Sequence, residues 1–196
     1  MFFETKSNLR AEQVRVLAAS GITSVQGGIE SFSDAILARM DKGSTGLGQV
    51  QFIKNAYETG IGVLYNILVR NPGDRPEDYE EMLELLPYIE HLPPPAGIVS
   101  CRLERFSPYH SAPARYGIRD VRPMPYYSEL YPDPQVDLKR IAYVFEYDHD
   151  MLHDEALWQV QRRFVERAFA WSRGWSPSSA YCYDHGDCII VEDRRP

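Results

Sequence analysis

Long apolar runs and an excess of basic charge are both missing from this sequence. No stretch approaches the about 20 apolar residues that a membrane-spanning helix needs, so we expect no membrane partner. Acidic residues outnumber basic ones by 28 to 21, and the net charge is -7. Nucleic-acid binding depends on a basic face, so this balance disfavours it. The opening residues MFFETKSNLR lack the anatomy of a signal peptide, and we expect a cytoplasmic location.

Cysteine is scarce as well, with only Cys101, Cys182 and Cys188. An odd count without a secretion signal argues against a disulfide framework. Cys182 and Cys188 flank a turn that contains His185, so a metal site or two free thiols on a hairpin are the alternatives there. The paired C-x-x-C spacing is absent, and we predict no metal site. Residues 148–155, rich in acidic residues and histidine, pose the same choice between a metal site and a solvated helix start.

Hydrophobic residues at 44% and charged residues at 25% are ordinary for a globular protein. The first half alternates apolar strand patterns with helical ones. Strands are predicted at 1–5, 22–26, 62–68 and 98–106, and helices at 11–19, 33–40, 47–59 and from 74 onward. This alternation favours a parallel sheet in an α/β fold. The nearly unbroken apolar run at 62–68 predicts a strand buried on both faces.

Helix-capping patterns accompany these segments. Asn8 is a candidate cap for the first helix. Asp74 and Glu77 have the spacing of a capping box, and Pro87 should kink that helix or limit its last turns.

The second half has a different character. Residues 107–134 are rich in proline and tyrosine without periodicity, which predicts a long ordered loop covering one face. Helices are predicted at 138–145 and 155–170, and a hairpin at 181–191. We therefore divide the chain into 1–106, a covering loop at 107–136, and a helical extension with a terminal hairpin at 137–196.

Ligands of parallel α/β sheets bind at the carboxyl ends of the strands, which directs attention to four segments. Residues 26–31 form a glycine-containing turn in which Glu30 and Ser31 offer groups for an amine or a hydroxyl. A tight turn with Ser31 or Ser33 capping the next helix explains the same residues. Asn66 in an apolar strand is either a ligand contact or a satisfied structural amide. Arg102, Glu104 and Arg105 alternate with apolar residues, as any half-exposed strand does.

Several stretches together resemble consecutive segments of radical S-adenosylmethionine (SAM) enzymes. They are FFETKSNL, QGGIESFSDAILARMDKG, YNILVRNPGD and RLERFSPYHSAPARYGI. The group they resemble most is the cobalamin-binding proteins that mature ribosomally synthesised peptides. The resemblance covers about the first two-thirds of the chain and is weaker toward the end.

The resemblance implies strands 3–6 of a partial (β/α)6 TIM-like barrel with an α+β C-terminal extension. It implies SAM and a 4Fe-4S cluster as cofactors of the complete enzyme, cobalamin as a further cofactor, and a ribosomal precursor peptide as partner. Glu4 would end the third strand, and Gln26 and Glu30 would lie near the methionine or ribose portion of SAM. Asn66 would lie on the fifth strand, and Arg102 and Arg105 on the sixth. The expected cofactor-binding residues are Glu4, Gln26, Glu30, Ser31, Asn66, Arg102 and Arg105.

Two departures from this family stand out. Its CxxxCxxC cluster motif is absent, and the three cysteines present cannot replace it because three thiolates must converge on one cluster. Arg70 occupies a position that is usually glycine. We therefore expect a C-terminal part of such an enzyme, inactive alone, binding no cofactor stably, and completed by a chain that supplies the missing N-terminal half. The alternatives are a non-catalytic peptide- or partner-binding module and a different barrel enzyme with chemistry at Glu4, Lys6 and Glu30.

Overall fold

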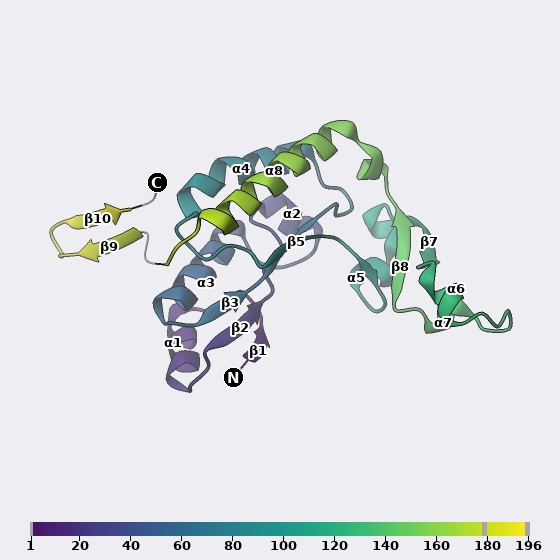
Figure 1. Cartoon of the computed structure of the whole chain (residues 1–196), viewed down its shortest axis with the longest axis horizontal. Coiled ribbons are helices and arrows are strands. Elements are labelled where there is room, and N and C mark those ends of the chain that lie inside the picture. The colour runs from purple at the N-terminus through teal and green to yellow at the C-terminus, as the bar shows by residue number, and fades with distance from the viewer. Residues whose placement is uncertain (1, 178–179, 195–196) are drawn as a thin grey trace.

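Short parallel strands form the N-terminal half of the fold in the computed structural model, which describes residues 2–177 and 180–194 (Figure 1). They are β1 (Phe2–Thr5), β2 (Ser24–Gly27), β3 (Gly62–Leu64), β4 (Asn66–Val69) and β5 (Gly97–Ser100). β1, β2 and β3 pair in that order, and β4 pairs with β5. Only Tyr65 separates β3 from β4, so one bent segment joins the two parallel groups. The prediction of parallel α/β pairing is confirmed.

Helices cover one face of these strands (Figure 1). They are α1 (Ala11–Ala19), α2 (Asp34–Arg39), α3 (Gly46–Glu58), α4 (Pro76–Ile89) and α8 (Glu155–Gly174). α8 comes from the far end of the chain and lies beside α4, where Phe164 meets the ring of Tyr79 edge-on at 5.8 Å. Near the end of α8, the Trp171 indole donates a hydrogen bond of 3.1 Å to the Leu92 carbonyl. The second half of the chain thereby becomes part of the main core.

The other face of the strands is open, and this corrects the prediction for 62–68. Val63, Tyr65 and Ile67 are buried against the helices, whereas Leu64 is 51% exposed and Asn66 is also exposed. The segment was expected to be buried on both faces. Since helices pack on one face only, alternate side chains remain at the surface of the described chain. Asn66 is accordingly no buried amide.

The start of α4 differs from the predicted capping box. The carboxylate of Asp78 accepts a hydrogen bond of 2.8 Å from the backbone N–H of Arg75, the residue before the helix. Asp74 instead turns inward and accepts a hydrogen bond from the Tyr79 hydroxyl. Pro87 lies within the helix, which continues to Ile89. The cap predicted at Asn8 is also wrong, because α1 begins after Arg10, whose N–H bonds Gln13 at 2.9 Å.

Residues 107–134 are not one long loop. They contain α5 (Pro108–Ser111), a 3-10 turn η1 (Pro113–Tyr116), β7 (Arg119–Pro123) and α6 (Tyr126–Leu130). The helix predicted at 138–145 is also wrong. Only α7 (Leu138–Ile141) is helical, and β8 (Val144–Asp148) follows it as the central strand of an antiparallel sheet between β6 (Leu103–Glu104) and β7. The strand predicted at 98–106 is divided for the same reason, since β5 and β6 belong to different sheets.

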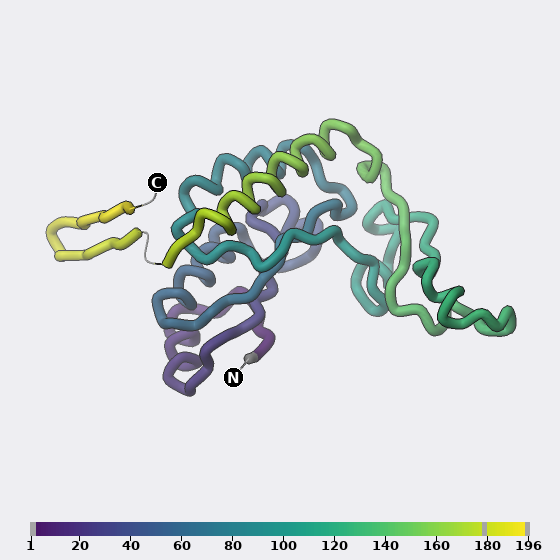
Figure 2. The backbone as a smooth tube through the Cα atoms, in the orientation of Figure 1, coloured from purple at the N-terminus to yellow at the C-terminus, as the bar shows by residue number. Residues whose placement is uncertain are grey.

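A small second core supports this antiparallel sheet. Leu103, Ile118, Ala142 and Phe145 are buried together, apart from the main core. The turn η2 (Asp150–His153) then connects β8 to α8. Figure 2 shows the backbone passing from the antiparallel sheet back over the main body along α8.

The predicted C-terminal hairpin is confirmed as β9 (Ala180–Asp184) paired with β10 (Ile189–Asp193). It extends beyond the main body (Figure 2). Across the described residues, no helix combines the length and apolar character needed to cross a membrane.

Candidate functional site

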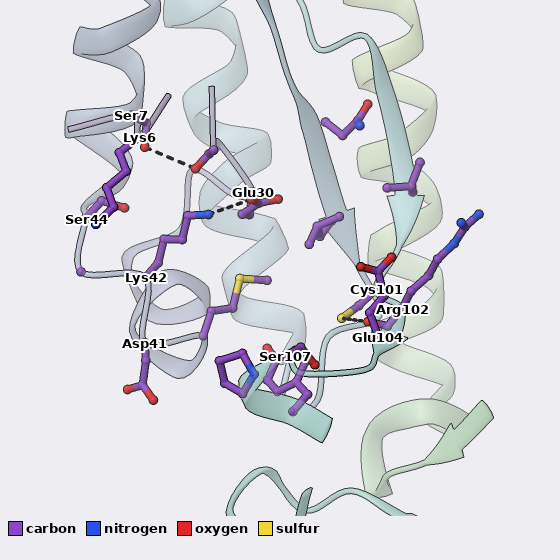
Figure 3. Close-up of a pocket in the computed structure, with 18 of the residues that line it drawn as sticks. Lys6, Ser7, Glu30, Asp41, Lys42, Ser44, Cys101, Arg102, Glu104 and Ser107 are labelled. Atoms are coloured by element: carbon purple, nitrogen blue, oxygen red, sulfur yellow. Dashed lines mark hydrogen bonds and ion pairs between the residues drawn. The ribbon is translucent and has the colours of Figure 1, made fainter. Parts of the chain in front are cut away.

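A cavity of about 960 Å³ lies at the carboxyl ends of the parallel strands (Figure 3). Its walls come from the segments after β1, β2 and β5 and from the loop after α2. A neighbouring cavity of about 400 Å³ runs along the open face of the strands and shares Glu30 and Asn66 with the first. Strand-end loops of a parallel sheet converge on one edge, so the fold itself creates this location.

Three predicted residues gather on the open face. Glu4 lies opposite Gln26 in the β1–β2 register, and both side chains are exposed. Asn66 begins β4, and with Glu4 and Gln26 it lines the smaller cavity. The carboxylate accepts hydrogen bonds, and the two amides both donate and accept them. This row therefore suits a ligand that carries hydroxyl and amino groups.

Glu30 forms an ion pair that the sequence did not reveal. Its carboxylate lies 2.7 Å from the Lys42 ammonium, and both side chains are partly buried (Figure 3). Gly28 leaves room for this ammonium, since a Cβ there would lie 3.1 Å from the Lys42 Nζ. The Ser7 hydroxyl donates to the Gly28 carbonyl at 3.3 Å and ties the β1 loop to this turn. Lys42 stands twelve residues from Glu30 in a glycine-containing loop, and no sequence spacing links the two.

Ser31 is the predicted site residue that the fold takes away from the cavities. It is fully buried, its hydroxyl donates to the Met82 sulfur at 3.4 Å, and it accepts from the Ser33 N–H at 3.1 Å. Ser33 caps α2 by accepting from the Ile36 N–H at 3.4 Å. The structural explanation of this turn therefore holds for both serines, while Glu30 retains access to the cavity.

The two predicted arginines separate. Arg102 lines the main cavity between β5 and β6. Arg105 lies outside both cavities, where its Nε donates to the Ala142 carbonyl at 2.6 Å and its guanidinium covers the Phe145 ring at 5.2 Å. Arg105 thus holds the α7–β8 connection against the antiparallel sheet.

Cys101 is a cavity residue of uncharged character. Burial raises the pKa of its thiol to about 12, so the thiol stays protonated at neutral pH. A protonated thiol is a poor nucleophile and a poor metal ligand. The Tyr147 hydroxyl donates to the Cys101 carbonyl at 3.1 Å and links β8 to the end of β5.

Asp74 is a buried carboxyl that sequence reasoning treated only as a helix cap. Burial raises its pKa to about 6, against the lowering effect of hydrogen bonds from Tyr79 and Asn71. The Asn71 N–H and side-chain amide donate to one oxygen at 2.9 and 3.1 Å. The network fixes the turn between β4 and α4 and lines neither of the two cavities.

The possible metal ligands of the described residues are dispersed. Among the described residues, no three His, Cys, Asp or Glu side chains lie close enough to hold a metal ion. Cys101 is buried at a strand end, whereas Cys182 and Cys188 are exposed on the terminal hairpin. An iron–sulfur cluster needs converging thiolates, and these three cysteines do not supply them.

Comparison with solved structures identifies proteins of similar fold. A cobalamin-dependent S-adenosylmethionine radical enzyme, OxsB, with aqua-cobalamin bound, matches 86% of this chain at a TM-score of 0.54 and 12% identity. This chain shares its fold with part of a radical SAM enzyme. The radical SAM methyltransferase TsrM from Kitasatospora setae, with cobalamin and a [4Fe-4S] cluster bound, matches 87% of the chain at a TM-score of 0.49 and 14% identity.

The shared portion is a fraction of those enzymes. The chain spans 28% of the OxsB chain and 35% of the TsrM chain. No protein-family model matches the sequence. No curated protein matches it either. At this identity the likeness establishes the fold alone.

Proposed function

We propose that the chain is the C-terminal part of a radical SAM enzyme that modifies a ribosomally synthesised peptide, with cobalamin-dependent C-methylation as its candidate reaction. The observation that carries the proposal is the fold shared with a cobalamin-dependent radical SAM enzyme over 86% of the chain. The resemblance of four consecutive sequence segments to such enzymes supports the same assignment and is the basis for proposing a peptide substrate. In this proposal β1 to β5 belong to a partial barrel whose open face is completed by a further protein segment.

The polar row on the open face fits SAM. When bound to the complete enzyme with its cluster, SAM would supply the adenosyl group for radical chemistry. Glu4, Gln26 and Asn66 present hydrogen-bonding groups on the strands, and Glu30 adds a carboxylate at the strand end. The carboxylate of Glu30, held by Lys42, is suited to accept a hydrogen bond from an amino or hydroxyl group. These residues would bind and orient the ligand, and the apolar wall formed by Leu64 and Leu68 would limit water access.

The cluster does not fit this chain. The three cysteines of this chain lie on separate elements, and no clustered acidic or histidine residues replace them within the described part of the chain. No reaction step through a cluster is therefore assigned to these residues. The cluster belongs, in this proposal, to the partner segment that completes the barrel.

The first test is the DNA sequence upstream of Met1. An in-frame extension that encodes CxxxCxxC would support the enzyme. The extended protein, purified without oxygen and reconstituted with iron and sulfide, should then cleave SAM to 5′-deoxyadenosine, whereas the present chain alone should not. SAM cleavage by the isolated chain would overturn the division of roles proposed here.

A second candidate function is a non-catalytic module that binds a peptide or a partner protein. The exposed apolar side chains Phe3, Leu64 and Val99 on the strand layer favour it, because exposed apolar surface is typical of interaction sites. A stop codon followed by a genuine start site, together with peptide binding in the absence of iron and SAM, would support this function over the first.

A further inference from the structure

A third cavity, of about 480 Å³, adjoins the candidate site on the side of the antiparallel sheet. It shares Ser100, Cys101 and Arg102 with the main cavity. We propose that this cavity binds an oxyanion, a carboxylate or a phosphate, carried on an apolar or aromatic body. Arg102 is the one residue of this cavity that the sequence analysis expected to bind a cofactor, and the fold comparison assigns no anion site here. The residues that carry the proposal are Arg70, Arg102, Arg122, Tyr126, Phe145 and Glu146.

Two neighbouring strand ends deliver two arginines to this cavity. Val69 of β4 pairs with Ser100 of β5; Arg70 follows the first strand directly, and Arg102 comes two residues after the second. Both arginines line the cavity and both are exposed. In Figure 3 the Arg102 side chain extends away from the Lys42–Glu30 pair. The Arg102 side chain is thus separate from that ion pair, and Arg70 lines the third cavity but not the main one.

The charges of this cavity are not balanced from within. Arg122 is neutralised by Glu146 at 2.7 Å across the β7–β8 register. Within residues 2–177 and 180–194, neither Arg70 nor Arg102 forms an ion pair. The cavity therefore carries two uncompensated positive charges on a chain of net charge -7. A guanidinium fork matches the two oxygens of a carboxylate or phosphate, so an oxyanion is the complementary ligand.

The backbone at Arg70 gives independent support. Arg70 has a φ of +61°, a conformation that glycine adopts freely and that costs a residue with a Cβ about 1 kcal/mol or more. A bulky cation at such a position is costly for folding alone. Arg70 lines the charged cavity, and a ligand bound there is a reason for arginine rather than glycine at this position.

The other side chains that line the cavity indicate the chemical character of the rest of the ligand. Tyr126 and Phe145 contribute rings, and Met124 and Val144 contribute apolar side chains. An anion with an aromatic or aliphatic body would place its charge at the arginines and its body against these side chains. If the cavity binds an acidic group of the peptide substrate, that assignment rests on the proposed function. Binding of an anion by itself needs neither iron nor SAM.

The test uses the whole chain and isothermal titration calorimetry with phenyl phosphate, phenylacetate and the neutral benzyl alcohol. We expect saturable binding of at least one of the two anions and none of the alcohol. Arg102→Gln and Arg70→Gly should each weaken the anion by about tenfold or more, since each removes a charge-assisted hydrogen bond. Arg173→Gln, at an exposed arginine of α8, is the matched control and should leave the affinity unchanged.

Arg70→Gly separates binding from folding. Glycine relieves the positive φ, so this variant should melt at the same temperature as the wild type or higher while it loses the anion. Preference for phenyl phosphate would identify a phosphorylated ligand, and preference for phenylacetate a carboxylate. Absence of saturable binding by both anions, or equal affinity in wild type, Arg70→Gly and Arg102→Gln, would overturn the site. SAM cleavage by the completed enzyme is measured separately, so it can succeed where anion binding fails.

Discussion

The two sheets of this protein are supported by cores of very different size. The parallel strands share one large apolar cluster with α1 to α4 and α8, whereas the antiparallel sheet rests on Leu103, Ile118, Ala142 and Phe145. The smaller region adds exposed ion pairs such as Arg122–Glu146, which contribute little to stability. The smaller region therefore depends on its attachment to the larger one, through the Tyr147–Cys101 hydrogen bond and the start of α8. The main cavity and the third cavity lie along this boundary.

The largest effect is expected from the contact between α8 and α4. Phe164 of α8 is almost fully buried beside Tyr79 of α4. Phe164→Ala removes that packing and leaves a cavity, so the free energy of unfolding should fall by about 3–5 kcal/mol. Urea denaturation followed by circular dichroism measures it. Phe169→Ala, at a phenylalanine of the same helix that is 49% exposed, is the control and should cost far less. Equal losses in both variants would mean that α8 does not belong to the main core.

A core mutation in the antiparallel sheet should act more locally. Leu103 is fully buried in the small cluster, and Leu103→Ala should cost about 2–5 kcal/mol of local packing. Hydrogen exchange read by mass spectrometry should speed up in β6, β7 and β8, with little change in α4. Leu86→Ala, in the large core, should accelerate exchange in α4 and α8 in addition to the antiparallel sheet. If Leu103→Ala and Leu86→Ala gave the same exchange pattern, the two sheets would unfold as one unit.

The same contrast explains which elements could be predicted from the sequence. In the first half each strand and helix carries its own periodicity, so residues 11–19 and 47–59 were predicted as helices close to the observed bounds. β8 could not be predicted this way. Its strand state depends on pairing with β6 and β7, about 40 and 25 residues earlier in the chain. The sequence pattern of the short helix α7 runs on into the start of β8, which is why one helix was predicted over 138–145.

The site residues divide along similar lines. The prediction of a parallel sheet selected Glu4, Gln26 and Asn66, and all three line the smaller cavity, although the open face itself was not predicted. That prediction could not separate Glu30, which reaches the cavity, from Ser31, which packs inward one residue later. The ion pair of Glu30 with Lys42 could not be predicted either, because the two side chains meet only through the folding of the loop after α2.

The pH dependence of stability should reveal the buried hydrogen-bond network around Asp74 in the large region, in contrast to the exposed ion pairs of the small region. The raised pKa of Asp74, about 6 against the ordinary 3.8, means that the folded state holds a proton that the unfolded state releases. Stability from this group is therefore present below about pH 4 and is lost as the pH rises through about 6. Asp74→Asn removes the titration but keeps an acceptor for Tyr79 and Asn71. From pH 4 to 7, the stability of the variant relative to wild type should rise by on the order of 1–3 kcal/mol.

Urea denaturation of both proteins at several pH values measures that difference. Asp133→Asn, at an exposed carboxyl in the loop between α6 and α7, is the control and should show no such trend. A difference between wild type and Asp74→Asn that is independent of pH would mean that Asp74 is more solvated than its burial in the fold indicates.

The smallest effect on stability is expected at the candidate site. Lys42 and Glu30 are partly exposed at the main cavity, and such ion pairs contribute about 0–1 kcal/mol. Lys42→Met should therefore leave the urea midpoint nearly unchanged, as should Lys54→Met, which breaks the exposed Lys54–Glu58 pair on α3. In the completed enzyme only Lys42→Met should weaken SAM binding, measured by titration calorimetry, because only that lysine holds Glu30 at the cavity. A large loss of stability in Lys42→Met would instead make the pair a structural support of the glycine turn, and equal SAM affinity in both variants would remove it from the site.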